Sequence, residues 1–232
     1  NTFRTTPRTF IKAGYSQNES EIISEQCCNM AIEAAKHAVK KENTLIAGSV
    51  APLEDCYEPL HFPGKEIAKK EFQLIIDRII RKGVDILLFE TMGNYEEIES
   101  VLQVSNHVDI QRWLSIVLKN KNSILDGTEL QKVVELANKN KIDMVLINCT
   151  PVNIILEALD IFLGYREGKW GVYPNAGENM PTKDGEFVSK LDDESFCKAI
   201  QGYITLGASV VGSCCGSTPN TVRKISNMIK KL

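Results

Sequence analysis

The chain repeatedly alternates a short apolar segment with a longer segment whose apolar residues recur at helical spacing. The apolar segments at 84–89 and 142–147 are nearly continuous, and a helical pattern follows each of them. A strand that is apolar on both faces has to be covered on both faces, which is typical of a parallel sheet packed between helices. The alternation therefore predicts an α/β fold built on a parallel sheet.

The predicted elements continue this alternation along the chain. Seven strands are predicted, at residues 1–4, 45–50, 84–89, 112–118, 142–147, 171–173 and 209–212. Helices are predicted at residues 21–41, 66–82, 128–139, 152–162, 192–206 and 219–231, and a further helix starts at a pattern that resembles a capping box, Asn94 with Glu97. Two architectures have this pattern, a doubly wound open sheet and a (β/α)8 barrel without one unit. The sequence contains no glycine-rich turn of the nucleotide-binding kind, which favours the barrel.

Length and charge restrict the class of protein. A chain of 232 residues fits a single barrel-type domain, so one domain is predicted over residues 1–232. The net charge of −3, without a basic block, argues against binding to nucleic acid. No apolar run approaches the length of a membrane span, and the polar residues 1–9 lack the apolar core of a signal peptide. We therefore expect a cytoplasmic protein without a membrane partner.

Two adjacent cysteines, Cys214 and Cys215, lie where the last predicted strand ends and the last predicted helix begins. Neighbouring side chains on a regular strand point to opposite faces, so both sulfurs reach one point only if the strand end is distorted. Gly212 and Gly216 flank the pair and permit unusual backbone angles. The chain has seven cysteines, mostly within apolar runs, which is typical of free or metal-bound thiols rather than of a disulfide framework.

Polar and thiol side chains gather where the predicted strands end. They are Ser49, Glu90, Asn148, Cys149, Asn175, Cys214 and Cys215. The carboxyl ends of parallel strands form one rim, where ligands bind in barrels and open sheets alike. Three thiolates from two strand ends can occupy three corners of a Zn²⁺ tetrahedron and leave the fourth open to a substrate atom. A zinc ion with this ligand set is suited to bind a substrate thiol and keep it as a nucleophilic thiolate at neutral pH.

Each of these residues also has a structural interpretation. A Cys-Cys pair is commonly two buried small apolar residues, and Cys149 after an apolar strand is a common core residue. Glu90 either receives a substrate ammonium group or serves as a charge partner at a helix N-terminus, because a carboxylate that ends an apolar strand is costly to bury unpaired. Asn175 is either a pocket residue or a turn residue. A redox pair at Cys214 and Cys215 is disfavoured, because vicinal disulfides are strained.

Six short motifs follow one another along the whole chain. They are Asn1-Thr2-Phe3, Ala47-Gly48-Ser49-Val50, Phe89-Glu90-Thr91, Asn148-Cys149-Thr150, Tyr173-Pro174-Asn175-Ala176-Gly177-Glu178 and Gly212-Ser213-Cys214-Cys215-Gly216-Ser217-Thr218-Pro219. Any one motif is weak, but the ordered set closely resembles the homocysteine S-methyltransferase family. The resemblance implies a (β/α)8 TIM barrel with zinc at its C-terminal face, held by Cys149, Cys214 and Cys215. Two departures are the absence of the family's first β/α unit, with its Asp-Gly-Gly-like turn, and Ser213 where the family most often has Gly.

The resemblance also implies an activity and a substrate. It implies an enzyme of methionine biosynthesis that transfers a methyl group to the thiolate of homocysteine and forms methionine. Glu90 is then expected to bind the amino group of homocysteine, with Thr2, Ser49, Asn148 and Asn175 shaping the pocket. The methyl donor is expected to be a small molecule, either S-methylmethionine, S-adenosylmethionine or betaine. The alternative is a non-catalytic zinc-binding or interaction protein derived from the same family. No oligomeric state is predicted.

Overall fold

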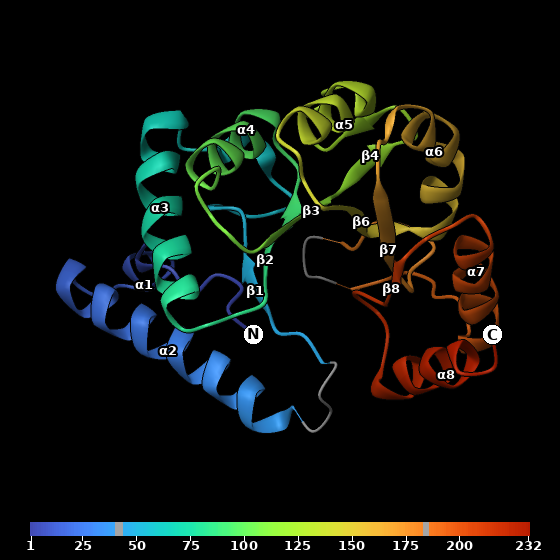
Figure 1. Ribbon diagram of the computed structural model, residues 1–232, viewed down its shortest axis with the longest axis horizontal. Coiled ribbons are helices and arrows are strands. Elements are labelled where there is room, and N and C mark those ends of the chain that lie inside the picture. Colours follow the sequence, from blue (N-terminus) through green and yellow to red (C-terminus); the bar gives the residue numbers. More distant parts are fainter. Residues whose placement is uncertain (40–43, 183–185) are drawn as a thin grey trace. The chain divides into compact units, whose positions relative to one another are not determined.

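The chain folds into two compact units, Asn1–Leu114 and Ser115–Leu232, in which helices alternate with strands (Figure 1). The computed structural model describes residues 1–39, 44–182 and 186–232. The strand pairs β1 with β2, β6 with β7 and β7 with β8 are all parallel. This pairing confirms the predicted α/β fold with a parallel sheet. None of the helices in the described ranges combines the length and the apolar character that a membrane span requires.

The first unit holds two paired strands with helices packed against them. Its elements, in chain order, are α1 (Pro7–Lys12), α2 (Gln17–Ala38), β1 (Ala47–Val50), the 3-10 helix η1 (Pro59–His61), α3 (Lys65–Arg81), β2 (Ile86–Met92), α4 (Tyr95–Val104) and β3 (Gln111–Ile116), which crosses into the second unit. In the pairing of β1 with β2, Ser49 lies opposite Leu88. A Cβ atom on Gly48 would lie 2.2 Å from the Ile79 side chain, so glycine is what lets β1 approach α3.

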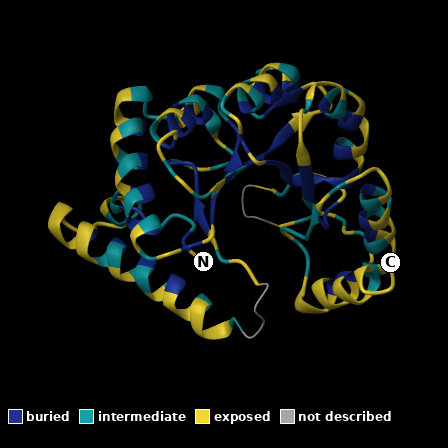
Figure 2. Ribbon diagram, in the orientation of Figure 1, coloured by how far each residue is buried: buried dark blue, intermediate teal, exposed yellow. Residues whose placement is uncertain are grey.

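The second unit holds three parallel strands and a short hairpin. Its elements after β3 are β4 (Leu118–Asn120), β5 (Ser123–Ile124), α5 (Leu130–Lys139), β6 (Met144–Pro151), α6 (Val152–Tyr165), β7 (Lys169–Asn175), α7 (Asp193–Thr205), β8 (Val210–Val211) and α8 (Pro219–Ile229). Buried residues lie mainly on the strands and on the helix faces next to them (Figure 2). Helix α5 buries four apolar residues on one face, which are Leu130, Val133, Val134 and Ala137.

The predicted strand at residues 1–4 is wrong. The chain makes a turn there, which the N–H of Thr5 closes by donating to the carbonyl oxygen of Thr2 at 3.2 Å. The side chain of Thr6 then accepts a backbone N–H of the first turn of α1, and Pro7 occupies the start of that helix. Proline suits this position, because its φ is already helical and its missing N–H would have had no partner there. The local β-propensity of the first residues is therefore overridden by a Thr-Pro helix start.

Two further differences concern a helix end and a hairpin. Helix α2 begins at Gln17 rather than at 21, because Ser16 and Glu19 form a capping box that stabilises an earlier start. The predicted end of this helix at Lys41 lies outside the described residues. The hairpin of β4 and β5 was not predicted, because strands of three and two residues are too short to show an alternating pattern.

Candidate functional site

Three cysteines from two strand ends of the second unit form a cluster. The Sγ atoms of Cys149, Cys214 and Cys215 all lie within 4.8 Å of one another. Cys149 and Cys214 are joined as a disulfide, and the Sγ of Cys215 lies 3.9 Å from the Sγ of Cys214. The Cα atoms of Cys149 and Cys214 are 5.7 Å apart. The described residues contain no other disulfide, so no disulfide framework is present.

The backbone is distorted at both strand ends that carry these thiols. Cys149 has a φ of 46°, and the pairing of β6 with β7 shifts register between Asn148 and Pro151. After β8, Gly216 has a φ of 80°. A positive φ is uncommon for a residue other than glycine and is concentrated at functional sites. The cysteine pair lies in the turn after β8, which ends at Val211, and the unusual non-glycine backbone angle of the cluster is at Cys149.

Two main-chain hydrogen bonds connect the cysteine pair to the end of β7. The N–H of Cys214 donates to the carbonyl oxygen of Pro174 at 2.9 Å, and the N–H of Ala176 donates to the carbonyl oxygen of Cys215 at 2.9 Å. The Cys149 side is buried, with 6% of the residue exposed, whereas Cys215 is exposed to solvent. The thiol cluster therefore has a buried side and an open side.

Two buried asparagines lie beside Cys149, Asn148 on β6 itself and Asn175 on the neighbouring strand β7. The Nδ2 of Asn175 donates to the carbonyl oxygen of Cys149 at 3.0 Å, and the hydroxyl of Ser115 donates to the Oδ1 of Asn148 at 2.7 Å. The Oδ1 of Asn175 is buried and has no hydrogen-bond partner among the described residues. An unpaired acceptor in a buried place is costly, so it is a candidate for contact with a bound molecule.

The thiol cluster fits a tetrahedral metal ion once the disulfide is reduced. Zinc–sulfur bonds of about 2.3 Å in a tetrahedron place neighbouring sulfurs about 3.8 Å apart. Cys214 and Cys215 already have that separation, at 3.9 Å, and all three sulfurs lie within 4.8 Å. Three thiolates would fill three ligand positions and leave a fourth for a substrate sulfur.

Three of the predicted substrate residues lie together in the first unit. The Oγ1 of Thr2 donates to the carbonyl oxygen of Ser49 and accepts from its N–H, both at 2.8 Å. The hydroxyl of Ser49 donates to the Oε2 of Glu90 at 2.5 Å. Helix α4, which follows Glu90, is capped by the side chain of Asn94. Thus Glu90 is hydrogen-bonded by Ser49 at the ends of β1 and β2, and Asn94 rather than Glu90 serves the N-terminus of the helix.

The structure also identifies a residue that was missed in the sequence. Ser115 is fully buried within the apolar strand β3, and its hydroxyl orients the side chain of Asn148. A single hydroxyl between Leu114 and Ile116 was the only signal available in the sequence. Such a signal says that a partner is required but does not identify that partner.

A family model describing homocysteine S-methyltransferases matches residues 1–229. The chain belongs to the homocysteine S-methyltransferase family. This membership confirms the predicted family, and it confirms the prediction of a methyltransferase at the level of the family. It also places the thiol cluster of β6 and β8 within a protein of that family.

Two plant methyltransferases align with nearly the whole chain. Homocysteine S-methyltransferase 2 of Arabidopsis thaliana is 28% identical over 251 residues, which span 96% of this chain and 75% of the relative. A selenocysteine methyltransferase of Astragalus bisulcatus is 26% identical over 98% of this chain and 76% of the relative. Both alignments extend across the two units.

Solved structures show the same fold. The metallated form of the homocysteine methyltransferase MmuM from Escherichia coli superposes with a TM-score of 0.78 at 23% identity, covering 98% of this chain and 77% of that chain. Its oxidized form superposes with a TM-score of 0.79 at 21% identity. At these identities the match establishes the fold, in agreement with the predicted barrel-type α/β class.

Proposed function

We propose that this protein transfers a methyl group from a small-molecule donor to the thiolate of homocysteine and forms methionine, with Zn²⁺ held by Cys149, Cys214 and Cys215. The observation that carries the proposal is the cluster of three thiols within 4.8 Å of one another in a member of this family. A metallated form of the structurally similar MmuM has been solved, which supports a metal site in this fold.

The ligand set determines what the bound metal would contribute. Zinc held by these three thiolates would supply a fourth position in which a substrate thiol would lose its proton more readily and stay nucleophilic. In the proposed reaction the substrate sulfur forms a bond to the methyl carbon while the carbon–donor bond breaks, with its electron pair leaving on the donor. Cys149 and Asn175 are buried, so they limit the access of water to one side of the thiol cluster.

We assign the remaining predicted residues to binding the amino-acid part of homocysteine. We assign Glu90 to its ammonium group, because a carboxylate fixed by the Ser49 hydroxyl is a ready acceptor. The hydroxyl of Thr2 bonds to the main chain of Ser49, so we assign Thr2 to shaping the pocket around Ser49 and Glu90. Asn148 and Asn175 shape the pocket from the strand ends that flank Cys149, and the unpaired Oδ1 of Asn175 supports a direct contact with substrate.

Small onium compounds are the donors that we propose. In S-methylmethionine, S-adenosylmethionine and betaine, the sulfur or nitrogen atom that carries the methyl group becomes uncharged as it leaves, so the protein has mainly to orient the donor methyl toward the substrate sulfur. The selenocysteine methyltransferase relative favours a second acceptor, since a selenol is the close chemical analogue of a thiol.

Methionine formation tests the proposal. Reduced protein is incubated with homocysteine and each donor in turn, and methionine is quantified by mass spectrometry, with selenocysteine as a parallel acceptor. Cys149→Ser and Cys214→Ser are expected to lose activity by about a hundredfold or more and to lose bound zinc, because a neutral hydroxyl replaces a thiolate ligand.

The matched control is Cys197→Ser, which changes a cysteine on α7 outside the cluster and is expected to keep both activity and zinc. Full zinc content in both ligand variants would contradict the metal assignment. Wild-type protein that binds zinc yet methylates neither acceptor with any donor would instead favour the non-catalytic alternative.

A further inference from the structure

Helix α4 carries a carboxylate that is buried rather than exposed to solvent. Glu97 lies in the first turn of α4 and only 4% of it is exposed, and its Oε1 accepts the backbone N–H of Leu53 at 2.8 Å. The adjacent Glu96 instead forms an ion pair with Lys65. Burying a carboxylate is unfavourable unless it makes specific hydrogen bonds, so the contact with Leu53 requires an explanation.

The bond made by Glu97 joins the two elements that carry the proposed substrate residues. Leu53 lies in the loop that leaves β1 just after Ser49, and Glu97 lies in the helix that leaves β2 just after Glu90. The hydroxyl of Ser49 donates to Glu90 across the same two strands. The bond from Leu53 to Glu97 therefore connects the segment after β1 with the segment after β2, in addition to the contact between Ser49 and Glu90.

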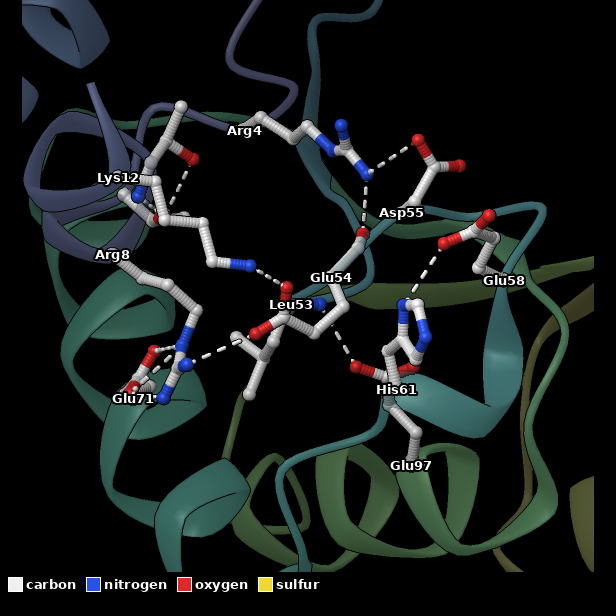
Figure 3. Close-up of polar contacts among 12 residues, drawn as sticks. Arg4, Arg8, Lys12, Leu53, Glu54, Asp55, Glu58, His61, Glu71 and Glu97 are labelled. Carbon is white, nitrogen blue, oxygen red and sulfur yellow. Dashed lines mark hydrogen bonds and ion pairs between the residues drawn. The ribbon is translucent and has the colours of Figure 1, made fainter. Parts of the chain in front are cut away.

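The opposite side of this loop is held by cations from the start of the chain (Figure 3). Arg8 pairs with Glu54 at 3.0 Å and with Glu71 of α3, and Lys12 also pairs with Glu54. Arg4 donates to the carbonyl oxygen of Glu54. The loop is thus fixed by partly exposed ion pairs on one side and by the buried Glu97 carboxylate on the other.

We propose that Glu97 is a positioning residue for substrate binding. By holding the backbone of Leu53, it fixes the loop after β1 and thereby keeps the Ser49 hydroxyl directed at Glu90. The ion pairs of Arg8 and Lys12 are screened by solvent and contribute little each, whereas the buried acceptor has no water to replace it. This inference rests on the proposed function, because it assigns Glu90 to the ammonium group of homocysteine.

The charge of Glu97 is sensitive to pH near neutrality. Its pKa is raised to about 7, mainly because the carboxyl is buried; the Leu53 N–H, Arg4 and Arg8 oppose the rise, and Glu54 adds to it. Lys65, on α3, is engaged with Glu96 and Glu99 on α4. A raised pKa means that the folded chain favours the protonated carboxyl, so ionisation above pH 7 weakens the packing of Glu97 against the loop rather than strengthening it.

Kinetics of three variants test the inference. Glu97→Ala removes the acceptor of the Leu53 N–H, Glu97→Gln keeps an acceptor oxygen without the charge, and Glu99→Gln is the control on the same helix, where the lost partner is a surface lysine. At pH 6, where Glu97 is mostly protonated, we expect Glu97→Ala to raise the KM for homocysteine by about 5- to 10-fold with kcat little changed, which is the loss of one hydrogen bond, and we expect both Gln variants to stay near wild type.

Amide hydrogen exchange provides a readout that does not require turnover. The peptide covering residues 51–56 should exchange faster in Glu97→Ala than in wild type at pH 6, and Glu97→Gln and Glu99→Gln should match wild type. Unchanged KM and unchanged exchange in Glu97→Ala would overturn the inference while leaving the proposed function intact. A wild type that neither binds nor methylates homocysteine, with the exchange difference present, would overturn the substrate role and the proposed function together.

Discussion

Single residues in the candidate site hold the main chain as much as they offer atoms to a ligand. Asn175 is fully buried and uses its amide to fix the carbonyl of Cys149, the residue with a φ of 46°. A non-glycine residue in that region persists only where its surroundings determine it. Cys214 is fixed in the same way through the carbonyl of Pro174. The main chain at Cys149 and at Cys214 is therefore held by hydrogen bonds from neighbouring residues.

The raised pKa of Glu97 leads to a prediction of how the stability of the fold depends on pH. Its pKa is about 7 in the folded chain against 4.5 when unperturbed, so between these pH values the folded state binds more protons than the unfolded state. The free energy of unfolding therefore falls as pH rises across this window, and the loss is complete above pH 7. Each pKa unit corresponds to about 1.4 kcal/mol, so the ionisation of Glu97 is expected to lower the free energy of unfolding by about 2 to 3 kcal/mol between pH 5 and pH 8.

Chemical denaturation of wild type and Glu97→Gln at both pH values checks this expectation. The two proteins should be similarly stable at pH 5, and wild type should lose stability relative to the variant at pH 8. A stability difference that stays constant between pH 5 and pH 8 would mean that Glu97 does not titrate in this range.

At the scale of elements, the capping box at the start of helix α2 can be tested by substitution. The N–H of Ser16 donates to Glu19, and the hydroxyl of Ser16 accepts the N–H of Glu19. Ser16→Ala should lower the free energy of unfolding by about 1 kcal/mol, because it leaves a first-turn N–H without its cap. Asn18→Ala in the same exposed turn is the control and should change stability by less than about 0.5 kcal/mol. Equal effects of both substitutions would show that the box does not stabilise the helix.

The strands that lead to the site could be predicted from the sequence because they are continuously apolar. The segments at 84–89 and 142–147 correspond to β2 and β6, and both continue past their predicted ends into the polar residues of the site. The segment at 1–4 was misassigned because Thr and Phe favour strands locally, whereas the Thr6-Pro7 start of α1 determines the structure. Local propensity is weaker than a specific cap and a tertiary contact.

The rim residues could be located from the sequence, but their partners could not. The position of Glu90 at the end of an apolar run was enough to mark it, and the same holds for Cys149. The bond from Ser115 to Asn148 and the bond from Leu53 to Glu97 each join segments that are far apart along the chain. Such pairs depend on how strands and helices pack, which a pattern within one segment does not contain.

At the scale of the whole molecule, the match to the family extends through both compact units. The fold and the family were predicted from different signals, since periodicity indicated a parallel α/β protein and the ordered motifs indicated homocysteine S-methyltransferases. The single barrel domain over residues 1–232, the zinc ion and the roles of individual site residues stay predictions. The central one among them is that the three thiols hold a metal with a position open to substrate.

X-ray absorption at the zinc edge tests that claim most directly. Reduced protein purified without chelator is measured alone and after addition of homocysteine. We expect about one zinc per chain with three sulfur neighbours, gaining a fourth sulfur when homocysteine binds. The absence of zinc from folded, reduced protein, or an unchanged number of sulfur neighbours after homocysteine is added, would contradict thiol activation at this cluster.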